Sequence, residues 1–284
     1  MASSNQVQPQ APGPLVPAHI ELRGGELVWD ALTISHRADP RRILDAFVRI
    51  EDADAVLRFA RRYGPLLLCS RGEHLGRDHR GEGCVLEVGP PWDRGVERIE
   101  HWIQWIREAR AIMRIKAALE LRHPGDEGDW ENIVTLGPQL SLMEEAGHGL
   151  RGMSPLWHEF GPPPAKSLAQ QSLDQQLDTL RWVVEHWLGR GDIRPVFRST
   201  DSGATVTLSA GTFGSLALQL FYALSGGKTT AVCDGCGTPY FPERKPRTDR
   251  MKFCPVCRQN GTAAKIQKRA QRGNSRRQEH VQEG

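Results

Sequence analysis

The chain lacks an apolar run long enough to cross a membrane. A spanning helix needs about 20 consecutive apolar residues, and no stretch of the 284-residue sequence approaches that length. Residues 1–17 also lack the charged start and apolar core of a secretory signal. They are polar and rich in proline, which is typical of a disordered tail. We therefore expect a cytoplasmic protein with no membrane partner.

Recognisable catalytic motifs are also missing. The Gly-x-Ser-x-Gly turn of serine hydrolases does not occur. His158 has no second histidine at the helical spacing of a zinc protease, and Tyr222 stands where a phosphate loop ending in Lys228-Thr229 would need glycine. These absences predict that the chain is not an enzyme.

Cysteine is scarce, but four of the six cysteines form two closely spaced pairs. Cys233 and Cys236 are separated from Cys254 and Cys257 by the 17 residues 237–253. In a reducing compartment such pairs favour metal over disulfide bonds. The spacing is typical of a tetrahedral Zn²⁺ site, and four thiolates leave no position for water or substrate. We therefore predict one structural zinc ion.

A second set of metal ligands lies earlier, where two cysteines and two histidines occur with four residues between neighbours. Cys69, His74, His79 and Cys84 are interspersed with glycines that would make the segment pliable. Two thiolates and two imidazoles are a complete zinc ligand set. Two interpretations follow: a second zinc ion, or a polar surface loop with two free thiols.

The composition is that of a globular protein, with 39% hydrophobic and 25% charged residues. Asp52 and Thr212 are candidate N-caps, and Gly24-Gly25 is a candidate hairpin turn. The periodicity of apolar residues and the turn signals predict helices over 52–63, 94–121, 168–188 and 212–224, and hairpins over 19–29 and 193–208.

These elements predict a mainly α fold with short β-hairpins, ending in a zinc-ribbon or treble-clef-like module. In that module, Tyr240-Phe241 and 251–253 are expected to be short strands that bring the cysteine pairs together. The following helix could begin at Pro255 or only at Thr262. We divide the chain into a disordered tail (1–17), a mainly helical domain (18–190), the hairpin, helix and zinc module (191–272) and a second disordered tail (273–284).

Positive charge is concentrated around the second cysteine pair. Residues 244–277 contain twelve lysines and arginines and a single acid, Asp249. If 263–272 is helical, its cations share one side, and Ala263, Ile266 and Ala270 share the other. One side could then pack on the zinc module while the other contacts phosphates. The candidate nucleic-acid contacts are Arg258, Lys265, Lys268, Arg269 and Arg272.

The segment from 193 to 272 resembles the CGNR-type zinc finger found at the C-terminus of bacterial transcription regulators. The shared layout is a hairpin, an apolar helix, Cys-x-x-Cys-Gly, a basic loop and a Cys-led basic helix, although the naming tetrapeptide here reads Cys257-Arg258-Gln259-Asn260. The resemblance implies DNA binding, carried over to Lys265, Lys268, Arg269 and Arg272.

Two functions follow as expectations. The first is a zinc-containing bacterial regulator that binds DNA through the zinc module, while the N-terminal domain senses a ligand or forms a homodimer. The alternative is a protein-interaction or scaffold protein, in which the zinc module is a rigid cap and the basic segment is a solvated face.

Overall fold

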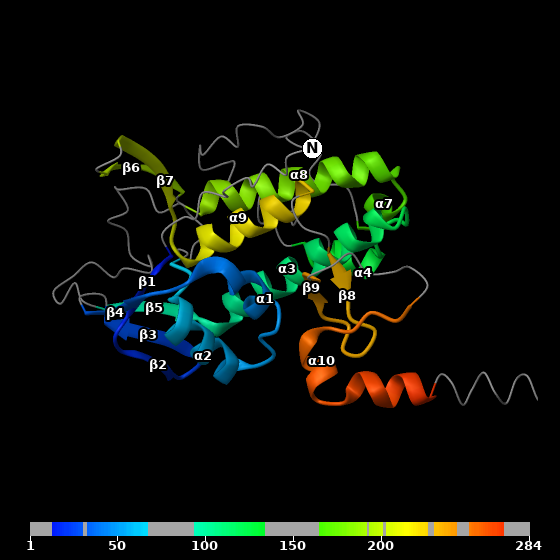
Figure 1. Ribbon diagram of the computed structural model, residues 1–284, viewed down its shortest axis with the longest axis horizontal. Helices are drawn as coiled ribbons and strands as arrows, with labels where there is room; N and C mark the ends of the chain where they lie inside the picture. The colour runs from blue at the N-terminus through cyan, green and yellow to red at the C-terminus, as the bar shows by residue number, and fades with distance from the viewer. Residues whose placement is uncertain are drawn as a thin grey trace, which may run out of the picture.

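The computed structural model describes residues 13–30, 33–67, 94–133, 165–191, 193–200, 203–226, 230–242 and 250–269. Helices predominate in these segments, and the strands form small antiparallel sheets (Figure 1). The expected class, mainly α with short hairpins and a C-terminal cysteine module, is therefore confirmed. None of the described helices combines the length and the apolar character needed to cross a bilayer.

The N-terminal lobe is built on a three-stranded sheet with the order β2-β3-β5. Strands β2 (Ile20–Arg23) and β3 (Glu26–Asp30) form the expected hairpin, turning at Gly24 and Gly25, whose φ angles are 57° and 85°. Such positive angles favour glycine because it has no Cβ. The hairpin prediction is therefore confirmed.

Two sequence predictions in this lobe were wrong. Strand β5 (Arg94–Arg98) lies where the helix over 94–121 was expected to begin, and it pairs with β3. Strand β1 (Leu15–Pro17) lies in the segment expected to be a disordered tail, and it pairs with β4 (Ile34–Arg37). Both strands depend on partners distant in sequence, which local periodicity does not register.

The predicted helices over 52–63, 168–188 and 212–224 and most of the one over 94–121 are present, whereas the short helices at 40–47, 127–131 and 165–169 were not predicted. Asp52 caps α2 (Ala53–Tyr63) by accepting a hydrogen bond from the backbone N–H of Ala55 at 2.7 Å, as expected. The hairpin β6–β7 is also confirmed. The elements of the body are η1 (Pro40–Arg42), α1 (Ile43–Phe47), α2 (Ala53–Tyr63), α3 (Ile99–Glu120), α4 (Glu127–Glu131), α7 (Ala165–Ala169), α8 (Leu173–Arg190), β6 (Arg194–Thr200), β7 (Gly203–Ser209) and α9 (Thr212–Leu224).

One large core joins the N-terminal lobe to α3, α8 and α9, which lie together in Figure 1. At its centre the ring of Trp187 stacks on Phe213 with centroids 4.6 Å apart, and Trp105 contacts both rings edge-on. Leu216 and Leu220 of α9 belong to this core. The separate core of the cysteine module begins only at Ala231, so the predicted boundary at 190–191 falls inside the body.

Thr212 has a different role from the one expected. The N-cap of α9 is Gly211, and the Thr212 hydroxyl instead donates a 2.7 Å hydrogen bond to the carbonyl of Tyr63 at the end of α2. This buried contact fixes the start of α9 against the N-terminal lobe. The position of α9 matters because the cysteine module follows it directly in the chain.

Candidate metal centre

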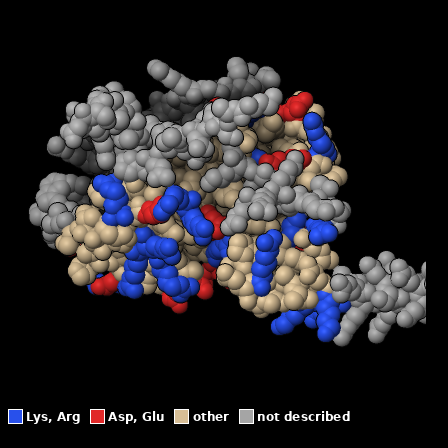
Figure 2. Space-filling model, viewed as in Figure 1, with Lys and Arg blue, Asp and Glu red and all other residues tan. Residues whose placement is uncertain are grey.

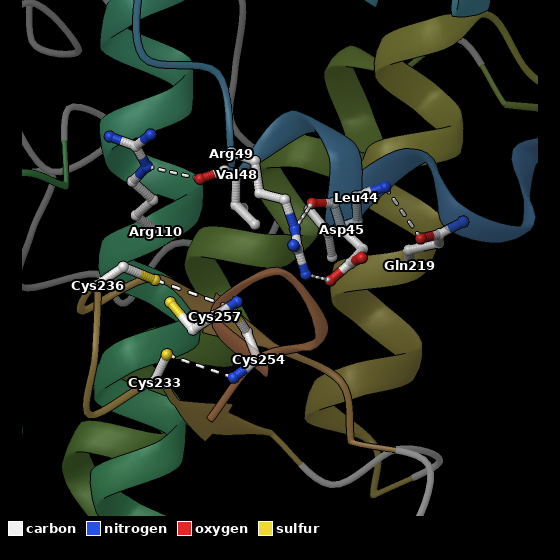
Figure 3. A network of polar contacts seen from close by, with 10 residues as sticks. All are labelled: Leu44, Asp45, Val48, Arg49, Arg110, Gln219, Cys233, Cys236, Cys254 and Cys257. Atoms are coloured by element: carbon white, nitrogen blue, oxygen red, sulfur yellow. Dashed lines mark hydrogen bonds and ion pairs between the residues drawn. The ribbon is translucent and has the colours of Figure 1, made fainter. Parts of the chain in front are cut away.

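Four cysteine sulfurs meet at one point of the C-terminal module. The Sγ atoms of Cys233, Cys236, Cys254 and Cys257 all lie within 4.8 Å of one another, and Figure 3 shows these side chains converging. A tetrahedral ion bound at about 2.3 Å by sulfur places the sulfurs about 3.8 Å apart. The 3.9 Å between Cys236 and Cys254 matches that geometry. The four side chains therefore fit a metal ion.

The first cysteine pair lies on a tight turn after strand β8 (Ala231–Val232), which pairs with β9 (Pro239–Tyr240). The turn closes through a 2.8 Å hydrogen bond from the N–H of Gly237 to the carbonyl of Cys233. Gly237 has a φ of 68°, and a Cβ at Gly235 would lie 3.2 Å from the sulfur of Cys257. The turn therefore favours glycine at both positions, at 237 for its backbone angle and at 235 for the space beside the sulfur.

The second pair begins helix α10 (Pro255–Gln259), with Cys254 as its N-cap and Cys257 inside it. The predicted pair of strands at 240–241 and 251–253 was wrong: β9 pairs with β8, and 251–253 forms no strand. Instead, the N–H of Asp234 donates to the carbonyl of Lys252 at 2.8 Å, and the N–H of Lys252 donates to the Asp234 carboxylate. These two bonds bring the cysteine pairs together.

Backbone N–H groups point at the sulfurs. Cys233 Sγ accepts hydrogen bonds from the N–H groups of Cys254 at 3.3 Å and Gly235 at 3.4 Å. Burial raises the pKa of Cys233, but backbone N–H groups, including these two, outweigh that effect and lower it to about 7. Burial raises the pKa values of Cys254 and Cys257. A bound cation would favour the thiolate form of all four, because thiolates are the metal-binding species.

The second candidate site, Cys69, His74, His79 and Cys84, lies outside the described residues. It therefore remains a prediction. Within the described part of the chain, the four C-terminal cysteines are the potential metal ligands that lie close enough together to share an ion.

The cysteine module is docked on helix α3 of the body. Strands β8 and β9 contact α3, and the N–H of Thr230 donates to Glu120 Oε2 at 3.2 Å. Glu120 also forms an ion pair with Lys116, one turn earlier on α3. The side chain of Phe241 packs against the main core. The module is therefore fixed to the body by polar and apolar contacts.

A basic helix over 262–269 follows α10 and projects away from the body (Figure 1). Gly261, with a φ of 76°, separates the two helices. One helix therefore begins at Pro255 and another at Thr262, the two start positions that the sequence allowed. Ala263 and Ile266 are partly buried against the module. Lys265, Lys268 and Arg269 are exposed, as the phasing predicted, whereas Ala270 and Arg272 lie outside the described residues.

Figure 2 shows Lys and Arg side chains gathered at the end of this helix. Lys265, Lys268 and Arg269 form no ion pair with any residue that the structure describes. Arg258 lies apart from them on α10, where it lines a cleft facing the N-terminal lobe. The structure therefore separates one of the predicted nucleic-acid contacts from the three described cations of the terminal helix.

Comparisons with protein-family models, curated proteins and solved structures found no match to this chain. The resemblance to the CGNR-type finger thus stays an expectation based on the layout of its residues. Sequence reasoning missed the docking on α3 and the cleft beside Arg258. No local signal marks either, because each brings together residues more than one hundred positions apart.

Proposed function

We propose that the chain is a zinc-containing bacterial regulator that acts in the cytoplasm and binds DNA through its cysteine module and basic helix. Zinc is the metal that four thiolates in paired Cys-x-x-Cys spacing most often hold. Its role is structural, because four protein ligands complete the tetrahedron. Zinc would hold α10, and with it the helix over 262–269, in a fixed position relative to the body.

The observation that carries the proposal is the two-sided packing of the basic helix. Ala263 and Ile266 face the module, and Lys265, Lys268 and Arg269 face solvent without acidic partners among the described residues. Eight residues of helix span about 12 Å, which is enough to reach neighbouring phosphates of a duplex. Glu120 of the body contacts the module at Thr230, just before β8, and the cations of the basic helix are exposed.

The test is a salt series. Each phosphate contact adds about 0.9 to the slope of log affinity against log salt for duplex DNA. We expect that replacing Lys265, Lys268, Arg269 and Arg272 with Gln weakens binding to mixed-sequence duplex and lowers the slope by about 0.9 per lost contact. Zinc content and melting temperature should barely change, because Lys265, Lys268 and Arg269 are exposed and form no ion pair with a described residue.

A matched variant controls for the loss of charge. It replaces four exposed cations of the body with Gln, namely Arg58, Arg107, Arg122 and Lys166. This variant should retain the salt slope of the wild type. Equal losses in both variants would show that only net charge matters, and a wild type that does not bind duplex at low salt would contradict the proposal.

The second candidate function, a scaffold or protein-interaction protein with the module as a rigid cap, is favoured by one observation. The module is docked on the body through Glu120 of α3 and through Phe241, which packs on the main core, as a cap would be. This function predicts that neither Gln variant changes duplex binding, because the wild type has none to lose. The salt series therefore separates the two functions directly.

A further inference from the structure

A cleft of about 700 Å³ lies between the N-terminal lobe and the cysteine module. One wall comes from η1 and α1, which contribute Arg41, Arg42 and Asp45. The opposite wall comes from α10, which contributes Arg258 and Gln259. The cleft is distinct from the metal centre, because none of the four cysteines lines it, and from the exposed face of the basic helix.

The charges of the cleft leave a positive surplus. Asp45 forms an ion pair with Arg49, whose Nη2 lies 3.1 Å from its carboxylate, so its negative charge is already compensated. Arg41 pairs with Asp39 at 2.6 Å. Arg42 and Arg258 form no ion pair with a described residue. Two guanidinium groups, one on each side of the cleft, therefore remain available for an anion.

The rest of the lining is mostly apolar. It includes the aromatic residues Tyr240, Phe241 and Phe253 together with Pro242 and Pro255. Burial raises the pKa of Tyr240, and the nearby positive charge of Arg258 opposes that effect. A cleft with an apolar lining and a few charged groups is the usual form of a small-molecule site. Duplex DNA, by contrast, presents a hydrated phosphate surface that gains little from buried aromatic rings.

We infer that this cleft binds a small organic anion. Arg42 and Arg258 would hold its carboxylate or phosphate, because the guanidinium group donates paired hydrogen bonds that match either oxyanion. An aromatic or aliphatic body would lie against Phe241 and Phe253. The ligand class is thus defined by one oxyanion joined to a flat or apolar group.

Such a ligand would add a direct link between η1–α1 and the cysteine module, in addition to the docking of the module on α3. The η1–α1 wall is fixed to α9, because Gln219 accepts a hydrogen bond from the N–H of Leu44 at 3.2 Å and donates one to the carbonyl of Pro40. The other wall belongs to the cysteine module. An anion held by both walls would restrain the module relative to the lobe. If the proposed function holds, this restraint is where an effector would change DNA binding.

The experiment measures ligand binding in the absence of DNA, so its result does not depend on the proposed function. Phenyl phosphate serves as the probe, with inorganic phosphate and phenol as its separated halves, and binding to the full zinc-loaded chain is followed by calorimetry. Phenyl phosphate should bind more tightly than either half. The double variant Arg42→Gln, Arg258→Gln should bind it about tenfold more weakly or worse, because charge-assisted hydrogen bonds are lost.

The matched control is Arg58→Gln, Lys166→Gln, which removes two exposed cations elsewhere and should bind as the wild type does. Melting temperature and zinc content confirm that both variants are folded. Three results would overturn the inference: no binding of phenyl phosphate at millimolar concentration, equal losses in both variants, or inorganic phosphate binding as tightly as phenyl phosphate.

Discussion

Glu97 is a buried carboxylate on β5 that joins two separate parts of the N-terminal lobe. Its oxygens accept hydrogen bonds from the N–H groups of Leu66 at 3.1 Å and Leu67, and from the indole N–H of Trp102 at 2.9 Å. Leu67 has a φ of 60°, an unusual angle for a residue with a branched side chain. The carboxylate therefore holds the segment after α2 against the first turn of α3.

We predict that Glu97→Gln destabilises the protein although its size hardly changes. A carboxylate only accepts hydrogen bonds, whereas the amide that replaces it presents an NH₂ group to N–H donors that already point inward. Unfolding in urea should show a loss of about 1–3 kcal/mol, the usual cost of an unsatisfied buried donor. The exposed Glu185→Gln on α8 is the control, and equal stability of the two variants would contradict the prediction.

The end of α8 and the first turn of α9 come into close backbone contact where two glycines meet. A Cβ placed on Gly214 would lie 2.2 Å from the carbonyl oxygen of Gly191, the residue that caps α8. Real atoms do not come so near, so backbone would have to move. Gly189, two residues earlier, has open space around its Cα. Gly214 and Gly189 therefore differ in what they contribute to the packing of the two helices.

This difference gives a paired prediction. Gly214→Ala should cost about 1–3 kcal/mol of unfolding free energy, because overpacking forces the helices apart. Gly189→Ala should leave stability unchanged or raise it by up to about 1 kcal/mol, because alanine is the better helix former. Thermal unfolding of both variants measures the effect, and a destabilised Gly189→Ala together with an unaffected Gly214→Ala would reverse the argument.

The elements that the sequence predicts well are those whose signals are local. Asp52 capping α2, the Gly24-Gly25 turn and the apolar phasing of Ala263 and Ile266 all involve neighbours within a few residues. The sequence predicts helix over residues 94–98, but these residues form a strand that pairs with β3, about seventy positions away. Tertiary structure decides such pairing, so the local sequence gives no signal for it. The cysteine ligands were predictable from spacing, whereas the docking of their module on α3 left no trace in the local sequence.

The described residues form two hydrophobic cores of unequal size. The large one runs from Val16 to Leu220, and the small one consists of Ala231, Tyr240, Phe253 and three of the four cysteines. A core this small cannot stabilise a fold without a metal or another covalent or ionic link. The large core has no described metal ligand cluster and contains most of the buried tryptophans.

We therefore expect zinc removal to act on one core only. A chelator should increase amide exchange strongly over 231–269, because zinc binding supplies the folding free energy of such modules, and leave exchange in α3 and α8 largely unchanged. The double variant Cys233→Ser, Cys254→Ser should lose the zinc and behave in the same way. Loss of protection throughout α3 would show instead that the module and body unfold together.

Metal analysis of the same samples also tests the second candidate site. A content near one zinc per chain that falls to zero in the cysteine variant would assign the metal to the C-terminal module alone. If one zinc remains in that variant and disappears when His74 and His79 are replaced by Ala, the earlier ligand set binds metal as well.

The hydrogen bonds that close the body have a consequence for the order of assembly during synthesis. Leu44 is bound to Gln219, 175 positions later, and Tyr63 to Thr212, 149 positions later. The N-terminal lobe therefore leaves the ribosome long before the residues that cover it, and its exposed apolar side chains must wait for α9. The cysteine module closes its contacts between Cys233 and Cys257 and needs no such delay. Folding of the body would thus depend on synthesis of the chain through α9, and folding of the module on the supply of zinc. Docking of the module on α3 would be the last step.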